Sequence, residues 1–102
     1  MRLYSAILGI YFLGPDLMDV AQYLNRVGIG SVSGPDLETL RLLHRAHLQT
    51  IPFENFDIRR GHPLVLNERS LFDKLVVRRR GGICYEQNVL FCSVLEAIGF
   101  SV

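Results

Sequence analysis

The sequence has no excess of charge of either sign. Among its 102 residues, 11 Lys and Arg stand against 10 Asp and Glu, which leaves a formal net charge of +1 at neutral pH. A chain without a strong overall field does not attract nucleic acid or an acidic surface through its net charge. We therefore expect neither nucleic acid nor a membrane as a partner, and the function must be argued from a specific site.

Cysteine is also scarce, with only Cys84 and Cys92 in the sequence. Two cysteines in a chain of this length do not make a disulfide framework. If both lie on one helix, their spacing of eight residues separates them by about 12 Å along the axis, which is beyond the reach of a disulfide. We interpret both as reduced thiols of a cytoplasmic protein.

The N-terminus carries a run of about a dozen mostly apolar residues, LYSAILGIYFLG at positions 3–14, which is too short to span a membrane. It has the length of a signal peptide, but the PDLMDVAQ that follows contains no small-x-small cleavage site. The alternatives are an additional packed strand or helix, or an extension ahead of a natural start at Met18. We favour an extension over residues 1–17, followed by one domain over residues 18–102.

The remainder of the sequence predicts four helices, near residues 19–27, 37–50, 68–76 and 84–98, with no repeat, linker or low-complexity tract. Asp19, Asp36 and Asn67 stand where residues that cap helix N-termini are expected. Gly28 and Gly99 follow two of the predicted helices, where glycine commonly ends a helix. Residues 52–63, PFENFDIRRGHP, are expected to form a loop after Pro52 stops the second helix.

Apolar residues recur at helical spacing in all four segments, which predicts a mainly α domain. The predicted core-facing stripes are Val20, Tyr23, Leu24 and Val27; Leu37, Leu40, Leu43, His44, His47, Leu48 and Ile51; Leu71, Phe72, Leu75 and Val76; and Cys84, Asn88, Phe91, Leu95 and Ile98.

The stretch RGGICYEQN, residues 80–88, places Cys84 at the predicted start of the last helix. The unpaired N–H groups and the positive end of the helix dipole favour a thiolate there. Gly81 and Gly82 would allow a sharp turn and the approach of a bulky substrate to the sulfur. The alternative is that Cys84 is a small buried apolar residue and that the glycines only form a turn.

Together these residues resemble a known family. Arg80-Gly81-Gly82-x-Cys84, followed by Glu86 and Asn88, is similar to the active-site motif of the bacterial arylamine N-acetyltransferases. Further similarities run from Met18 to Val102, and they are Met18-Asp19, Tyr23-Leu24, Arg26-Val27-Gly28, Asp36-Leu37-Glu38-Thr39-Leu40, His44 and Ile51-Pro52-Phe53-Glu54-Asn55. The resemblance implies the N-terminal helical-bundle domain of a thiol-protease-like α+β fold, without the family's β-barrel and lid domains.

The resemblance also implies a reaction. Cys84 would accept an acetyl group from acetyl-CoA and pass it to an arylamine, hydrazine or hydroxylamine nitrogen, with no resident cofactor. Arg80 and Glu54 match two positions that the family joins in a structural salt bridge, and Gly81 and Gly82 complete the support of the site. Phe53 matches a position that lines the acceptor pocket, although a core aromatic is an equally good interpretation of this residue.

The catalytic histidine and aspartate of the family lie in a β-rich region downstream of the cysteine helix, and this sequence ends at Val102. His44, His47 and His62 match no catalytic position of the family, and we do not expect any of them to act as the base. We therefore expect a fragment that is inactive alone and that associates with itself through exposed apolar surface.

Two alternatives from other classes remain open. One is a non-catalytic helical domain or binding module with a reactive thiol, and the other is a thiol hydrolase of transglutaminase-like architecture. We do not expect a metal site, because His44, His47, Cys84 and Cys92 show no zinc-ligand spacing.

Overall fold

The computed structural model describes residues 19–102, so the predicted extension over residues 1–17 and its boundary at Met18 lie outside the described residues. Its elements are α2 (Val20–Val27), α3 (Leu37–Thr50), α4 (Phe56–Arg59), α5 (Glu68–Phe72), the π-helical turn η1 (Asp73–Val77) and α6 (Cys84–Ile98). Within this part of the chain there is no strand, only one isolated parallel bridge between Phe53 and Gly82. The prediction of a mainly α domain is confirmed.

The helix ends follow the local chemistry of the sequence. Asp19, Asp36 and Asn67 each accept a hydrogen bond from the backbone N–H three residues later, at 3.1, 2.8 and 2.8 Å. Gly28 ends α2 in the left-handed conformation (φ 82°), and Gly99 ends α6 at φ 121°. All three predicted N-caps and both glycine ends are confirmed.

The third predicted helix, residues 68–76, is not a regular α-helix throughout. It begins as α5 and continues as η1, where the N–H of Arg78 donates to the carbonyl of Asp73 at 2.8 Å, five residues back. The backbone carbonyl of Leu75 in this wider turn accepts a hydrogen bond from Arg26 Nε of α2 at 2.7 Å. A buried arginine therefore links α2 to the turn that leads toward the cysteine.

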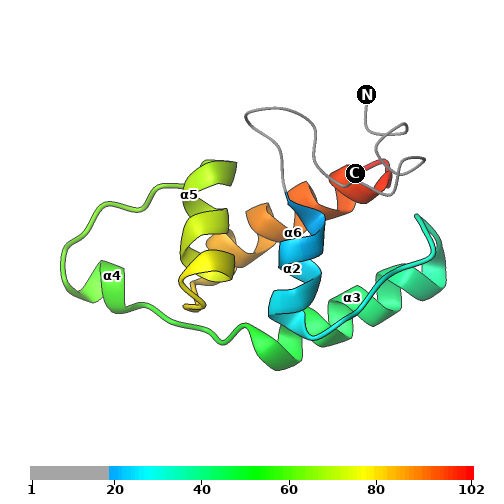
Figure 1. Cartoon of the computed structure of the whole chain (residues 1–102). Coiled ribbons are helices and arrows are strands. Elements are labelled where there is room, and N and C mark those ends of the chain that lie inside the picture. Colours follow the sequence, from blue (N-terminus) through cyan, green and yellow to red (C-terminus); the bar gives the residue numbers. More distant parts are fainter. Residues whose placement is uncertain (1–18) are drawn as a thin grey trace.

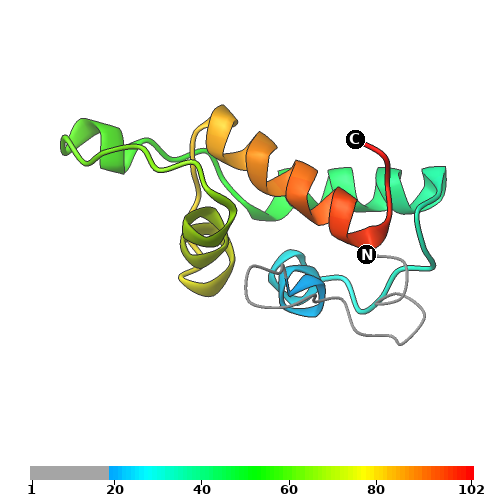
Figure 2. The same cartoon turned by 90° about the horizontal axis from the view of Figure 1, so that it is seen from above.

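The segment after α3 contains a short helix where only a loop was predicted. This helix, α4, lies at the end of an arm that extends away from the other helices in both views (Figures 1 and 2). None of its four residues is buried. The sequence pattern did not reveal it because a single turn is too short to show a helical period.

Seen from above, α2 and α5–η1 lie side by side toward the lower edge of the view, and α6 runs obliquely across α3 beside them (Figure 2). The core between them consists of Val20, Tyr23, Leu24, Val27, Leu43, Ile51, Leu71, Leu75, Val76, Leu90, Val94, Leu95, Ala97 and Ile98. No helix within residues 19–102 is long and apolar enough to cross a membrane.

Two predicted stripes match the faces that are actually buried only in part. On α3 the prediction was correct for Leu43, His47 and Ile51, which are buried. It was wrong for Leu37 and Leu48, which are 59% and 64% exposed. His44 is exposed as well. The predicted stripe was wider than the part of α3 that its neighbours cover, and the buried side extends instead toward Thr39.

On α6 the prediction was correct for Leu95 and Ile98 and wrong for Cys84 and Asn88, which are exposed. The face of α6 that packs against α2 and α5 carries Leu90, Val94 and Ala97. Cys84 is therefore not a small buried apolar residue, and its thiol is open to solvent.

Candidate active site

Cys84 is the first residue of α6, and Ile83 is the N-cap. An isoleucine side chain cannot accept a hydrogen bond, so the first-turn N–H groups receive no side-chain cap from this position. Glu86 instead reaches back, and its Oε1 accepts from the Ile83 N–H at 3.0 Å. The exposed thiol thus lies at a helix end where backbone N–H groups and the helix dipole stabilise negative charge.

The thiol follows a junction between two loops that are distant in sequence. The Gly82 N–H donates to the Pro52 carbonyl at 3.1 Å, and the Glu54 N–H donates to the Gly82 carbonyl at 3.0 Å. These bonds form the parallel bridge between Phe53 and Gly82. The predicted PFEN loop and the cysteine loop therefore meet directly before α6.

Gly81 and Gly82 are required for a different reason from the one predicted. Neither has a positive φ, so no left-handed turn explains them. Both are buried, and a Cβ at Gly81 would lie 2.0 Å from the Pro52 carbonyl oxygen. A Cβ at Gly82 would lie 2.7 Å from Glu86 Oε1. The glycines allow close packing of the junction.

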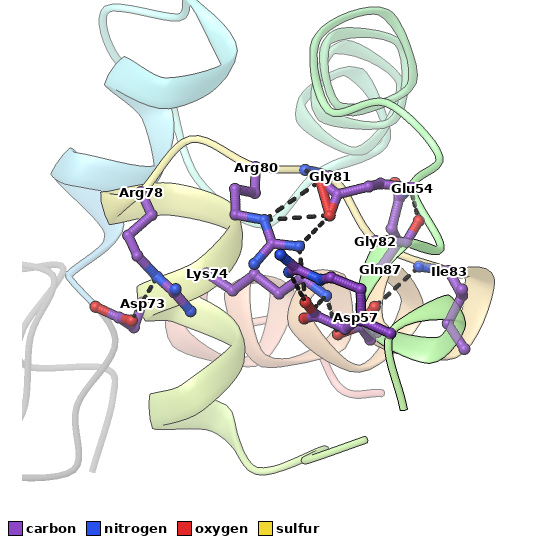
Figure 3. A network of polar contacts seen from close by, with 12 residues as sticks. Glu54, Asp57, Asp73, Lys74, Arg78, Arg80, Gly81, Gly82, Ile83 and Gln87 are labelled. Carbon is purple, nitrogen blue, oxygen red and sulfur yellow. Dashed lines mark hydrogen bonds and ion pairs between the residues drawn. The ribbon is translucent and has the colours of Figure 1, made fainter. Parts of the chain in front are cut away.

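The ion pair expected between Arg80 and Glu54 is present (Figure 3). Arg80 Nε donates to the two Glu54 carboxylate oxygens at 3.1 and 3.4 Å, and Arg80 Nη2 also contacts Glu54 Oε1. Glu54 Oε2 accepts from the Gly81 N–H at 3.2 Å. The bond from Arg80 holds the pKa of Glu54 below its usual value, although burial opposes this shift.

Sequence reasoning missed the charges behind this pair. Asp57 of α4 accepts from Arg80 Nη2 at 3.0 Å and from Lys74 Nζ at 2.8 Å, and Lys74 Nζ also lies 2.9 Å from Glu86 Oε2 (Figure 3). Burial disfavours the charged ammonium of Lys74, but its bonds to the two carboxylates outweigh this and raise its pKa. A signal was available in the sequence, because Lys74 interrupts an otherwise apolar stripe.

With the exposed Arg60, which lies 2.8 Å from Asp57, this ionic cluster contains three cations and three carboxylates. Its members are Glu54, Asp57, Arg60, Lys74, Arg80 and Glu86. The cluster ties the α4 arm to η1 and α6. Hydrogen bonds from Lys74, Arg60 and Arg80 hold the pKa of Asp57 well below its usual range.

The three histidines occupy different environments. His44 is exposed with its ring 6.2 Å from that of Phe91, and His62 is exposed between α4 and α5. His47 is buried between Tyr23 and Gln87, and this burial lowers its pKa. Within residues 19–102, none of the three hydrogen-bonds to the Cys84 sulfur.

Two aromatic residues at or near the loop junction are exposed. Phe53 is 67% exposed, so it is not a core aromatic, and Tyr85 beside the thiol is 66% exposed. A hollow of about 520 Å³ lies between the α4–α5 loop and α5–η1, with Asp57, Lys74 and Glu86 in its wall. Cys84 does not line this hollow, so the thiol lies on an open surface of the described chain.

Known proteins are similar to this chain in sequence and in fold. A family model described as N-acetyltransferase matches residues 36–102. The arylamine N-acetyltransferase of Mycolicibacterium smegmatis is 50% identical over 86 residues. The chain belongs to the arylamine N-acetyltransferase family. The Escherichia coli arylamine N-acetyltransferase is 42% identical over 80 residues.

Solved arylamine N-acetyltransferases have the same helical fold in their N-terminal part. The Nocardia farcinica enzyme superimposes with a TM-score of 0.79 at 46% identity, and the match covers 83% of this chain and 30% of that one. The Mycobacterium marinum enzyme in complex with CoA gives a TM-score of 0.75 at 45% identity, over 79% and 30% of the two chains. Against the M. smegmatis relative the match covers 83% of this chain and 31% of the relative, so the chain spans about a third of its length.

Proposed function

We propose that this chain carries the acetyl-accepting cysteine of an arylamine N-acetyltransferase, and that Cys84 is this residue. The observation that carries the proposal is an exposed thiol on the first residue of α6, directly after a loop held by Arg80 and Glu54. The donor is acetyl-CoA, which the CoA complex of the M. marinum relative supports. The acceptor is an arylamine, hydrazine or hydroxylamine.

The reaction proceeds in two transfers. The Cys84 thiolate attacks the acetyl carbonyl carbon, a new carbon–sulfur bond forms, and the bond to the coenzyme A sulfur breaks as that sulfur leaves and takes up a proton. The acceptor nitrogen then attacks the same carbon, the bond to Cys84 breaks, and the nitrogen loses a proton. A thioester intermediate of this kind splits one difficult transfer into two easier ones and gives ping-pong kinetics.

The neighbouring residues have supporting roles in this proposal. Arg80, Glu54, Gly81 and Gly82 hold the loop that delivers the start of α6. Phe53 takes no part in the core and lies opposite Gly82 in the bridge, which suits contact with an aromatic acceptor. The free thiols of Cys84 and Cys92 support a cytoplasmic location.

The base must come from outside the described helices. His47 uses both ring nitrogens in buried hydrogen bonds, so it has no free nitrogen to offer a thiol. A general base must lie within hydrogen-bond reach of the proton that it removes. We therefore place the base in the part of the family fold that this chain does not span.

The proposal is tested with purified residues 1–102 and two donors. Acetyl-CoA with a simple aromatic amine measures turnover, and an activated phenyl acetate supplies acetyl groups without needing a coenzyme A site. Intact-mass analysis should find acetylation at Cys84 with the phenyl ester, whereas turnover should be no faster than that of Cys84→Ala. Equal acetylation of Cys92 would contradict the assignment of the nucleophile, and sustained Cys84-dependent turnover would contradict the external base.

We also propose that the chain associates with itself through the apolar side chains around the α4 arm. Phe53, Phe56, Ile58 and Tyr85 are each at least 48% exposed, and exposed apolar groups of this kind favour association. Sedimentation velocity should show an average mass that rises with protein concentration. A monomer over the whole accessible range would contradict this part of the proposal.

A further inference from the structure

Three buried or half-buried side chains from three helices form a series of hydrogen bonds. The Tyr23 hydroxyl of α2 lies 2.7 Å from His47 Nδ1 of α3, and His47 Nε2 lies 3.1 Å from Gln87 Oε1 of α6. Gln87 Nε2 in turn donates to the carbonyls of Pro52 at 3.1 Å and Gly82 at 3.0 Å. We call Tyr23, His47 and Gln87 the Gln87 network.

The contacts determine where each proton lies. Gln87 Nε2 faces two carbonyl oxygens, so it must be the amide nitrogen and Oε1 must face His47. Because this oxygen can only accept, His47 Nε2 carries the ring proton and Nδ1 accepts from the Tyr23 hydroxyl. Every bond therefore points in one direction, from α2 toward the loop junction.

The network is rigidly held. Tyr23 is fully buried and His47 is 4% exposed. The ring of Phe91 meets that of His47 edge-on, with centroids 5.2 Å apart and an angle of 66°. A hydrogen-bonded side chain in this setting has one orientation, so the amide of Gln87 is presented to the junction in a fixed position.

The two carbonyls that Gln87 binds belong to the two sides of the junction. The Pro52 carbonyl also accepts from Gly82 N–H, and the Gly82 carbonyl also accepts from Glu54 N–H. The Gln87 amide therefore binds both sides of the pairing of the two loops. Cys84 follows Gly82 by two residues, so any shift of this pairing moves the first turn of α6.

We propose that His47 and Gln87 are positioning residues for Cys84, which hold the junction in the register that places the thiol at the α6 N-terminus. This inference rests on the proposed role of Cys84 as nucleophile. The ionic cluster holds the junction through Glu54, which binds the Gly81 N–H, and the Gln87 network holds it through two backbone carbonyls.

The test uses alkylation of Cys84 by iodoacetamide, with Cys92 of the same chain as the internal reference. Gln87→Leu removes both donors to the junction, and His47→Leu removes the bond that orients Gln87. His47→Gln keeps a donor for Gln87. Gln49→Leu, at an exposed position of α3, is the matched control. Rates are followed by intact mass from neutral to mildly alkaline pH, and circular dichroism checks that each variant is folded.

We expect Gln87→Leu and His47→Leu to lower the ratio of Cys84 to Cys92 alkylation by about fivefold, which is the size of a lost helix-end contribution to the thiolate. The pH profile of Cys84 should move to higher pH in both variants, His47→Gln should restore it, and Gln49→Leu should leave it unchanged. Folded leucine variants with the wild-type ratio and profile would overturn the proposal.

A measurement on the unchanged chain covers the case in which the leucine variants do not fold. Amide hydrogen exchange at Gly82 and Glu54 reports the junction directly, because both N–H groups pair across it. We expect protection comparable to that of α6, and exchange as fast as that of the exposed Gly30 would overturn the proposal. None of these readouts needs acetyl transfer, so a failure of the proposed function alone would leave them unchanged.

Discussion

The carbonyl oxygen of Pro52 lies 2.0 Å from the place that a Cβ atom would occupy at Gly81. No real Cβ can approach an oxygen so closely, so the two backbones can meet only because residue 81 has no side chain. The contact joins the loop after α3 to the loop before α6. The position of the candidate nucleophile therefore depends on a packing requirement as well as on the helix that carries it.

The first prediction concerns this contact. Gly81→Ala should destabilise the fold by about 2 kcal/mol or more, because the methyl group must displace the Pro52 backbone. Gly30→Ala is the control, since a Cβ there would meet no atom within 4 Å and its φ is not positive. Urea unfolding followed by circular dichroism measures both, and equal midpoints for the two variants would contradict the packing argument.

The second prediction concerns the ion pair of Glu54 with Arg80. Glu54→Gln should cost about 1–3 kcal/mol, because it weakens charge-assisted bonds in a partly buried site. Asp73→Asn breaks the ion pair between Asp73 and Arg78, and both of these side chains are more than half exposed. This change should lower the stability by less than about 0.5 kcal/mol. Denaturant unfolding of both variants measures the two losses of stability. Equal losses in Glu54→Gln and Asp73→Asn would contradict the prediction.

The third prediction separates the two thiols of α6. Both are exposed, so accessibility does not distinguish them. Cys84 should still alkylate faster, because only Cys84 lies at the helix end where the thiolate is stabilised. Mass spectrometry after brief exposure to iodoacetamide gives the two rates. Equal labelling would count against a special role for Cys84.

The fourth prediction concerns pH. Burial lowers the pKa of His47 from its usual value of 6.5, so below that pH the unfolded chain binds a proton that the folded chain does not. The stabilisation is complete above about pH 6.5 and is lost as the pH falls, with a slope of at most about 1.4 kcal/mol per pH unit.

Thermal unfolding between about pH 8 and pH 5.5 measures this dependence before the carboxylates begin to titrate. His47→Gln should flatten the curve, and the exposed His44→Gln should not. If the unfolding temperature of the wild-type chain does not change over this pH range, protonation of His47 does not destabilise the fold and the prediction is wrong.

Much of the helical structure could be predicted from short stretches of sequence. The caps at Asp19, Asp36 and Asn67 and the glycine end at Gly28 depend on hydrogen bonds and backbone angles within four residues. Local chemistry of this kind is the same wherever the helix lies in the fold. The π-helical turn was not predictable, because nothing within residues 68–77 indicates where an extra residue enters the turn.

The site could be predicted only where the family motif supplied it. The partnership of Arg80 with Glu54 came from the resemblance, since 26 residues separate them and no periodicity links them. Lys74 was assigned no role, because its partners Asp57 and Glu86 come from segments whose proximity is set by packing. His47 was predicted as a member of an apolar stripe but not as a hydrogen-bonding residue, because its partners Tyr23 and Gln87 also come from distant segments.

The sequence by itself determined the positions of α2, α3, α5 and α6, the caps at which they begin, and that Cys84 opens the last of them. These features depend on interactions between near neighbours, and the residue types specify such interactions directly. Tertiary structure alone decided how much of α3 and α6 is buried, because the width of the covered face depends on the neighbouring helices. It also decided that the Pro52 and Gly82 carbonyls share one amide of Gln87, since bonds between distant segments form only when the core has brought those segments together.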